Sequence, residues 1–141
     1  MIARIAQGIL FAGFLICGSI SDLRTHTVPD WVWMGIAGSA LIGMRQSSLP
    51  SMLLGATAVL LIEVPLAVAM KDHAIGGADI KISAAGAFLL GWKRGLAALI
   101  LGLLLFVVII PLERLIRHEK QDKAFPLVPF LAAGQLAVYL I

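Results

Sequence analysis

The sequence predicts an all-α membrane protein, a six-transmembrane-helix bundle with an irregular segment before the fourth helix. Composition is the first observation behind this prediction, since 60% of the 141 residues are hydrophobic, only 13% are charged, and the mean hydropathy is +1.00. Soluble domains carry about twice that charged fraction. The second observation is that long apolar runs, separated by short polar breaks, fill the chain. Such runs are typical of helices that cross a bilayer, and one integral membrane domain over residues 1–141 accommodates all of them.

Taken in order, the apolar runs predict the membrane spans. They lie at about 2–21, 31–45, 50–70, 75–91, 95–116 and 125–141. Because a bilayer core needs about 20 helical residues to cross it, the second and fourth runs are short. We expect them to tilt, to thin the bilayer locally, or to continue as irregular backbone buried in protein. The first run is interpreted as a retained helix, because no convincing cleavage site closes it.

The basic residues predict how the spans are oriented. Loops after the first, third and fifth spans carry seven of them, and the other side of the membrane receives four. The positive-inside tendency places those three loops in the cytoplasm and both termini outside, as in a multi-pass protein of the cell (inner) membrane. The lipid bilayer is therefore an expected partner, and the mild basic excess gives no indication of nucleic-acid binding. The single cysteine, Cys17, excludes an intrachain disulfide and a four-cysteine zinc site.

Two acids fall at the predicted inner boundary of the membrane. A helix that starts near Arg4 reaches Asp22 after roughly 27 Å. A helix traced back from Trp92 reaches Asp79 after about 20 Å, which leaves this acid beneath the cytoplasmic surface. Carboxyl groups held close together share a proton, so one can deprotonate a water while the other polarises a peptide carbonyl. Asp22 and Asp79 are therefore the candidate catalytic pair.

The residues around the two acids suggest supporting roles. Gly76 and Gly77 are expected to take backbone angles closed to other residues, to let chains approach closely, and to allow the backbone to break from helix at membrane depth. Asp30 is expected to cap the second span as its N-cap residue. Lys81 is expected to extend to the inner surface, where it could pair with an acid or hold substrate main chain.

The residues alone leave other functions open. Asp22, Glu63 and Asp79 could form a relay in a small ion- or proton-translocating membrane protein, because intramembrane acids are functional candidates. Glu63 could equally be a protonated structural acid bonded to a neighbouring helix. The chain could also be a structural subunit of a membrane assembly. A metal site built with His26 and His73 is disfavoured, because loop histidines without close helical spacing are usually ordinary loop residues. We expect no metal and no cofactor, and we interpret Glu119 and Asp122 as part of a solvated loop.

Three motifs in the chain resemble those of the type IV prepilin peptidase family, membrane aspartic proteases of the Gly-x-Gly-Asp kind. The first is "DLRTHTVPD", an acid followed six residues later by a hydrophobic-Pro-Asn/Asp group, with Asp22, Pro29 and Asp30. The second, glycine-rich and ending in Asp-x-Lys, is "GGADIK" with Asp79 and Lys81. The third is "FPLVPFLAAG", similar to a closing Pro-x-x-Pro-Phe-x-x-x-Gly element.

The resemblance implies a protease that cuts prepilin-like precursors at the cytoplasmic membrane boundary. Its partners would carry a short basic leader ahead of a hydrophobic helix, and Asp22 and Asp79 would be its catalytic residues. Ala78 departs from the pattern, because the family often has glycine there. Larger relatives carry a cysteine-rich cytoplasmic region with an N-methylating activity. With only Cys17 and no long loop, this chain resembles the small, peptidase-only branch.

Overall fold

The computed structural model describes residues 1–42, 48–70, 75–118 and 125–141. Within these residues the chain forms six helices and no strand, which confirms the all-α prediction. The helices are α1 (Ile2–Thr25), α2 (Asp30–Ala40), α3 (Leu49–Ala69), α4 (Gly77–Leu90), α5 (Trp92–Arg117) and α6 (Val128–Leu140).

Three of these helices, α1, α3 and α5, are long and apolar enough to cross a membrane. The other three have 11, 14 and 13 residues. At 1.5 Å per residue they extend about 17–21 Å, which is shorter than a hydrocarbon core of about 30 Å. The second and fourth segments were expected to be short, and α6 is shorter than its expected 125–141 range because residues 125–127 precede the helix.

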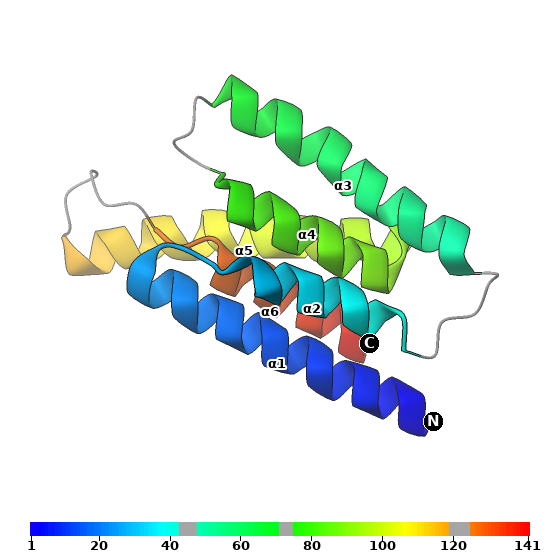
Figure 1. The fold of residues 1–141 in the computed structure, drawn as a ribbon. Coiled ribbons are helices and arrows are strands. Elements are labelled where there is room, and N and C mark those ends of the chain that lie inside the picture. Colours follow the sequence, from blue (N-terminus) through cyan, green and yellow to red (C-terminus); the bar gives the residue numbers. More distant parts are fainter. Residues whose placement is uncertain (43–47, 71–74, 119–124) are drawn as a thin grey trace.

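Helix α4 lies at the centre of the bundle, where it packs against α2, α3, α5 and α6 (Figure 1). Two buried apolar clusters meet on it. One joins α1, α2, α4 and α6 around Phe11, Ile36 and Ile82. The other joins α3, α4, α5 and α6 around Val59 and Leu131. Because α4 is enclosed in this way, Asp79 near its start is buried in protein.

Outward-facing surfaces of the long helices are apolar. Large side chains such as Ile9, Leu61, Val107 and Leu115 are more than half exposed. A soluble protein rarely exposes so many large apolar groups on one set of helices. Lipid is the environment in which such faces are stable, which agrees with a membrane protein.

Both chain termini lie at the same end of the bundle (Figure 1). The Tyr139 hydroxyl, near the end of α6, donates a hydrogen bond to the Arg4 carbonyl oxygen at 2.7 Å. The end of α1 and the start of α4 lie at the opposite end. The residues around Asp22 and Asp79 are thereby gathered far from the termini.

Candidate active site

Asp22 lies in the last turn of α1, which continues to Thr25 and so extends beyond the expected end at residue 21. Its side chain is 8% exposed. Its Oδ2 atom accepts a hydrogen bond of 3.2 Å from the backbone N–H of Val128, the first residue of α6. The N–H groups at a helix start have no partner within the helix and carry partial positive charge, so they favour an anion. The start of α6 therefore stabilises and orients the Asp22 carboxyl group.

Asp79 is held by a similar arrangement at the start of α4. It is the third residue of that helix and is 9% exposed. Its Oδ2 atom accepts a hydrogen bond of 2.7 Å from the backbone N–H of Gly76, the N-cap residue. The acid thus satisfies one of the donors left free at its own helix start, which fixes its orientation.

Of the two reasons expected for the glycines, the one based on backbone angles closed to other residues is wrong. Gly76 has φ −82° and ψ 159°, extended angles that any residue adopts, and Gly77 is already the first residue of α4. In the described residues only Gly91 among the glycines has a positive φ. The other expected reason, close approach, fits Gly76, because a Cβ atom there would lie 3.2 Å from Asp79 Oδ2, whereas a Cβ atom on Gly77 would meet nothing within 4 Å. Ile75 and Gly76 are non-helical, as expected before the fourth helix, whereas residues 71–74 lie outside the described residues.

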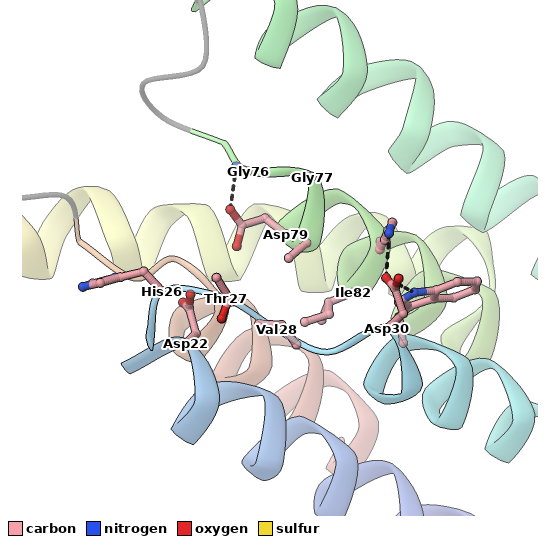
Figure 2. Close-up of a pocket in the computed structure, with 12 residues that line it drawn as sticks. Asp22, His26, Thr27, Val28, Asp30, Gly76, Gly77, Asp79 and Ile82 are labelled. Atoms are coloured by element: carbon pink, nitrogen blue, oxygen red, sulfur yellow. Dashed lines mark hydrogen bonds and ion pairs between the residues drawn. The ribbon is translucent and has the colours of Figure 1, made fainter. Parts of the chain in front are cut away.

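Asp22 and Asp79 line one cleft of about 380 Å³ at the end of the bundle opposite the termini. Figure 2 shows their side chains reaching toward the same space from α1 and from α4. They are close enough for the charges of the two carboxyl groups to interact. The remaining lining comes from the α1–α2 connection, α2 and α4: His26, Thr27, Val28, Asp30, Trp33, Gly76, Gly77, Ala78, Lys81 and Ile82.

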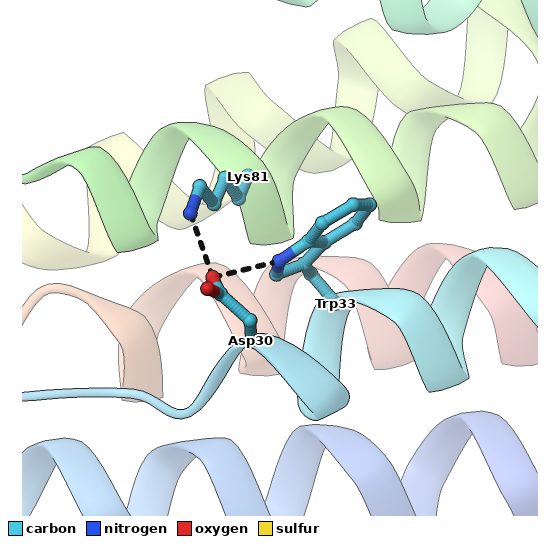
Figure 3. A network of polar contacts seen from close by, with 3 residues as sticks. All are labelled: Asp30, Trp33 and Lys81. Carbon is cyan, nitrogen blue, oxygen red and sulfur yellow. Dashed lines mark hydrogen bonds and ion pairs between the residues drawn. The ribbon is translucent and has the colours of Figure 1, made fainter.

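Asp30 and Lys81 form an ion pair at the rim of this cleft (Figure 3). Lys81 Nζ donates to Asp30 Oδ1 at 2.6 Å, and Trp33 Nε1 donates to the same oxygen at 3.0 Å. Lys81 Nζ also lies 5.9 Å from the centre of the Trp33 ring. The hydrogen bond from Lys81, followed by that from Trp33, lowers the pKa of Asp30 below its usual value of 3.8. The expected pairing of Lys81 with an acid is therefore observed.

The predicted capping role of Asp30 is wrong. Pro29 is the N-cap residue of α2, Asp30 is the first helical residue, and no side chain caps this helix. The Asp30 carboxylate instead turns outward to Lys81 and Trp33. Instead of capping its own helix, Asp30 contacts Lys81, which lies 51 residues away in the second motif. The two side chains become neighbours only in the folded bundle.

Glu63 lies apart from the cleft. It is 0% exposed within α3, and neither of its carboxyl oxygens has a hydrogen-bond partner among the described residues. It does not line the cleft. It nevertheless lies near enough to Ser83 and Asp79 on α4 to interact with both.

The third motif contributes to the site through its backbone, which the sequence did not indicate. Val128, inside "FPLVPFLAAG", supplies the N–H that holds Asp22. Pro129 lies in the first turn of α6, and Gly134 packs directly against Ala98 and Gly102 of α5. Because the donor is a backbone N–H, which every residue except proline has, the residue types could not indicate the hydrogen bond from Val128 to Asp22.

No group of three or more His, Cys, Asp or Glu side chains that could hold a metal ion occurs in the described part of the chain. His26 lines the cleft, where it ends α1 with a left-handed backbone φ of 51°. Its proposed metal partner His73 lies outside the described residues, as do Glu119 and Asp122.

The family model for the type IV leader peptidase family matches residues 9–112, which is more than half of the chain. The matched range contains Asp22, Asp30, Asp79 and Lys81, and it ends before the closing "FPLVPFLAAG" segment. No curated protein and no solved structure matches the chain significantly.

Proposed function

This chain belongs to the type IV leader peptidase family, and we propose that it is an aspartic endopeptidase in which Asp22 and Asp79 together activate a water molecule. The observation that carries the proposal is the single cleft that both acids line, although they lie on helices far apart in the sequence. Three apolar helices and the family together indicate a protease of the inner membrane.

The proposed reaction needs one carboxylate and one carboxylic acid on the two sides of a peptide bond. The carboxylate takes a proton from water as the water oxygen bonds to the carbonyl carbon, and the acid gives its proton to the carbonyl oxygen. The tetrahedral intermediate then collapses and the C–N bond breaks. The nitrogen leaves with a proton from the first aspartate, and a hydroxyl of the intermediate returns its proton to the second aspartate as the new carboxyl group forms. Backbone N–H groups hold Oδ2 of both acids, which supports the fixed orientation this exchange requires.

We further propose that the substrate is a prepilin-like precursor with a short basic leader ahead of a hydrophobic helix. The precursor helix would lie in the bilayer beside the bundle, and its leader junction would enter the cleft at the cytoplasmic boundary. In this topology all six helices belong to the membrane region. The short α2, α4 and α6 are surrounded by other helices and by thinned bilayer, rather than each spanning a full hydrocarbon core.

The direct test is cleavage of co-expressed candidate precursors, measured by a mobility shift. Asp22→Asn and Asp79→Asn keep the size of each side chain but remove its acid chemistry. Each should lower the cleavage rate by about 10²- to 10⁴-fold or more, the usual contribution of a general acid or base. Glu113→Gln is the matched control, because Glu113 is an acid of α5 that pairs with Arg117 and does not line the cleft. Near-normal processing by either aspartate variant would overturn the proposal.

The alternative function is translocation of ions or protons. The observation in its favour is that Glu63 lies near enough to Asp79 for the two acids to interact. A relay would require Asp22, Glu63 and Asp79 to exchange protons across the bundle. It predicts flux in liposomes that depends on pH or voltage and is lost in the aspartate variants, with no precursor cleaved. Cleavage without such flux would support the peptidase proposal alone.

A further inference from the structure

Glu63 is the most unusual side chain of the described residues that the proposed reaction leaves unused. It lies six positions before the end of α3, it is 0% exposed, and both of its carboxyl oxygens lack a hydrogen-bond partner. Buried polar groups in folded proteins are almost always paired. A carboxyl group kept in this position therefore calls for an explanation beyond packing.

Two polar side chains of α4 face Glu63. Asp79 and Ser83 are four residues apart in one helix, so they lie on the same face, one turn from each other. Glu63 interacts with both across the α3–α4 contact. Ser83 is 3% exposed, and its Oγ atom also has no hydrogen-bond partner among the described residues. Neither Glu63 nor Ser83 lines the cleft that Asp79 lines.

Among the described residues, no other charged group forms an ion pair with Glu63. The second helix packed against α3 is α5, and no residue of α5 forms an ion pair with Glu63 in the described structure. The charged residues of that helix lie near its two ends: Lys93, Arg94, Glu113, Arg114 and Arg117. Asp79 is therefore the charged group that faces Glu63 most directly.

We propose, on the premise of the peptidase function above, that Glu63 is a positioning residue that keeps its own proton and so leaves the negative charge of the Glu63–Asp79 pair on Asp79. Two adjacent buried carboxyl groups do not ionise together without large cost. Asp79 has a backbone donor at 2.7 Å, the start of a helix and the open cleft to stabilise its charge. Glu63 has none of these, so the proton rests on Glu63.

This arrangement decides which aspartate acts as the base and which as the acid. With the proton on Glu63, Asp79 is the carboxylate that accepts the proton of the attacking water, and Asp22 is the acid that protonates the carbonyl oxygen. Ser83 lies near enough to Glu63 to interact with it, although no hydrogen bond joins the two side chains in the described structure. A small shift of either side chain lets the Ser83 hydroxyl accept from the O–H of Glu63. Glu63 acts on the substrate only through Asp79.

The pH dependence of cleavage distinguishes this role from packing. With Asp22 as the acid, cleavage declines at alkaline pH when Asp22 loses its proton. In the wild type, ionisation of Glu63 adds a negative charge near the two aspartates, which holds the proton on Asp22 to higher pH. Glu63→Gln has the same size, keeps a donor and stays neutral. We expect it to cleave within about threefold of the wild type at neutral pH, with its alkaline decline moved to lower pH by about one pH unit or more. Superimposable profiles, or a loss as complete as that of Asp79→Asn, would overturn the proposal.

Variants that remove the hydrogen-bonding groups give a second, independent measurement. Glu63→Leu removes an unpaired buried acid, so the melting temperature in detergent should stay the same or rise, while cleavage falls by about tenfold. Ser83→Ala should lower kcat several-fold, whereas Ser39→Ala, an equally buried serine of α2, should not. Full cleavage activity in Glu63→Leu would show that Glu63 does not position Asp79 for the reaction, and it would contradict the proposal.

Failure of this inference is separable from failure of the proposed function. If the wild type cleaves a precursor and both aspartate variants are inactive, the peptidase assignment stands whatever the Glu63 variants do. If wild-type protein cleaves none of the precursors, the premise itself has failed and the Glu63 inference falls with it.

Discussion

Asp30 and Lys81 connect α2 to α4 at the rim of the cleft, and their geometry explains why both motifs end in a charged residue. Lys81 Nζ lies 2.6 Å from Asp30 Oδ1 and also faces the Trp33 ring. Both partners are at least half exposed, so solvent and salt weaken the attraction. The pair is therefore better suited to fixing the positions of the cleft walls than to holding the bundle together.

Lys81→Gln should raise the pKa of Asp30 toward 3.8, because Lys81 is the largest cause of its lowering. A lowered folded-state pKa means that the pair contributes stability above the unfolded value of 3.8. That contribution is lost as the pH falls through the folded pKa, so neutral pH leaves the pair intact. The measurement is an NMR titration of the Asp30 carboxyl carbon in micelles. A Lys81→Arg control should keep the low value, and an unchanged titration in Lys81→Gln would contradict this account.

Residue types alone predicted which acids to consider but not how they are held. Asp22 and Asp79 were recognisable because charged groups are rare in such an apolar chain and both fall near one predicted boundary. Their donors were not recognisable, since both are backbone N–H groups, of Val128 and Gly76. For the same reason Asp30 was expected to form a local cap, whereas its partner Lys81 becomes adjacent only after α2 packs on α4.

Among the helices, the contact between α5 and α6 depends on small residues. A Cβ atom on Gly134 would lie 2.6 Å from the Ala98 carbonyl oxygen and 2.7 Å from the Gly102 backbone nitrogen. Backbone atoms of a neighbouring helix have no room to move aside, so the helices touch directly. Close approach of this kind is how membrane helices gain packing energy without a hydrophobic driving force. It also places the start of α6, with its Val128 N–H, against Asp22.

Gly134→Ala should destabilise the protein by about 1–3 kcal/mol, the usual cost of overpacking a filled contact. Cleavage should fall in parallel, because α6 carries the Val128 donor. Gly13→Ala is the matched control, since a Cβ atom on this exposed glycine of α1 meets nothing within 4 Å. It should leave stability unchanged or raise it by about 0.5–1 kcal/mol. Thermal unfolding in detergent micelles measures both, and equal stability of the two variants would refute the packing argument.

Apolar runs predicted the existence and order of the helices well, because burial in lipid or protein requires little more than hydrophobic composition. The ends were less predictable. Helix α1 continues through Asp22 to Thr25, past the polar residues that were expected to end it, since Ser21 and Thr25 satisfy backbone carbonyls at the turn. Helix α5 likewise begins at Trp92, three residues before the expected start at 95. Such ends depend on local hydrogen bonds that hydropathy does not measure.

Taken whole, the bundle has two chemically different ends. The termini lie at one end, and the cleft with its acids and the Asp30–Lys81 pair lies at the other. The exposed apolar surface between these ends belongs to lipid. We propose that the cleft end faces the cytoplasm, because seven of the eleven basic residues fall, by sequence, in or beside the connections that follow α1, α3 and α5. The two ends of α5 can report this orientation, since the helix has 26 residues and extends about 39 Å.

Single cysteines at the two ends of α5 should therefore react from opposite sides of the membrane. Arg94 and Arg117 are both exposed and neither lines the cleft, so Arg94→Cys and Arg117→Cys form a matched pair in a Cys17→Ala background. In right-side-out vesicles a membrane-impermeant maleimide should label only Arg94→Cys, and in inverted vesicles only Arg117→Cys. Each substitution removes one positive charge, which leaves at least six basic residues on the cleft side, so the charge bias should survive. Labelling of Arg117→Cys from outside would place the cleft on the outer surface and would exclude cleavage of precursors that still carry a cytoplasmic leader.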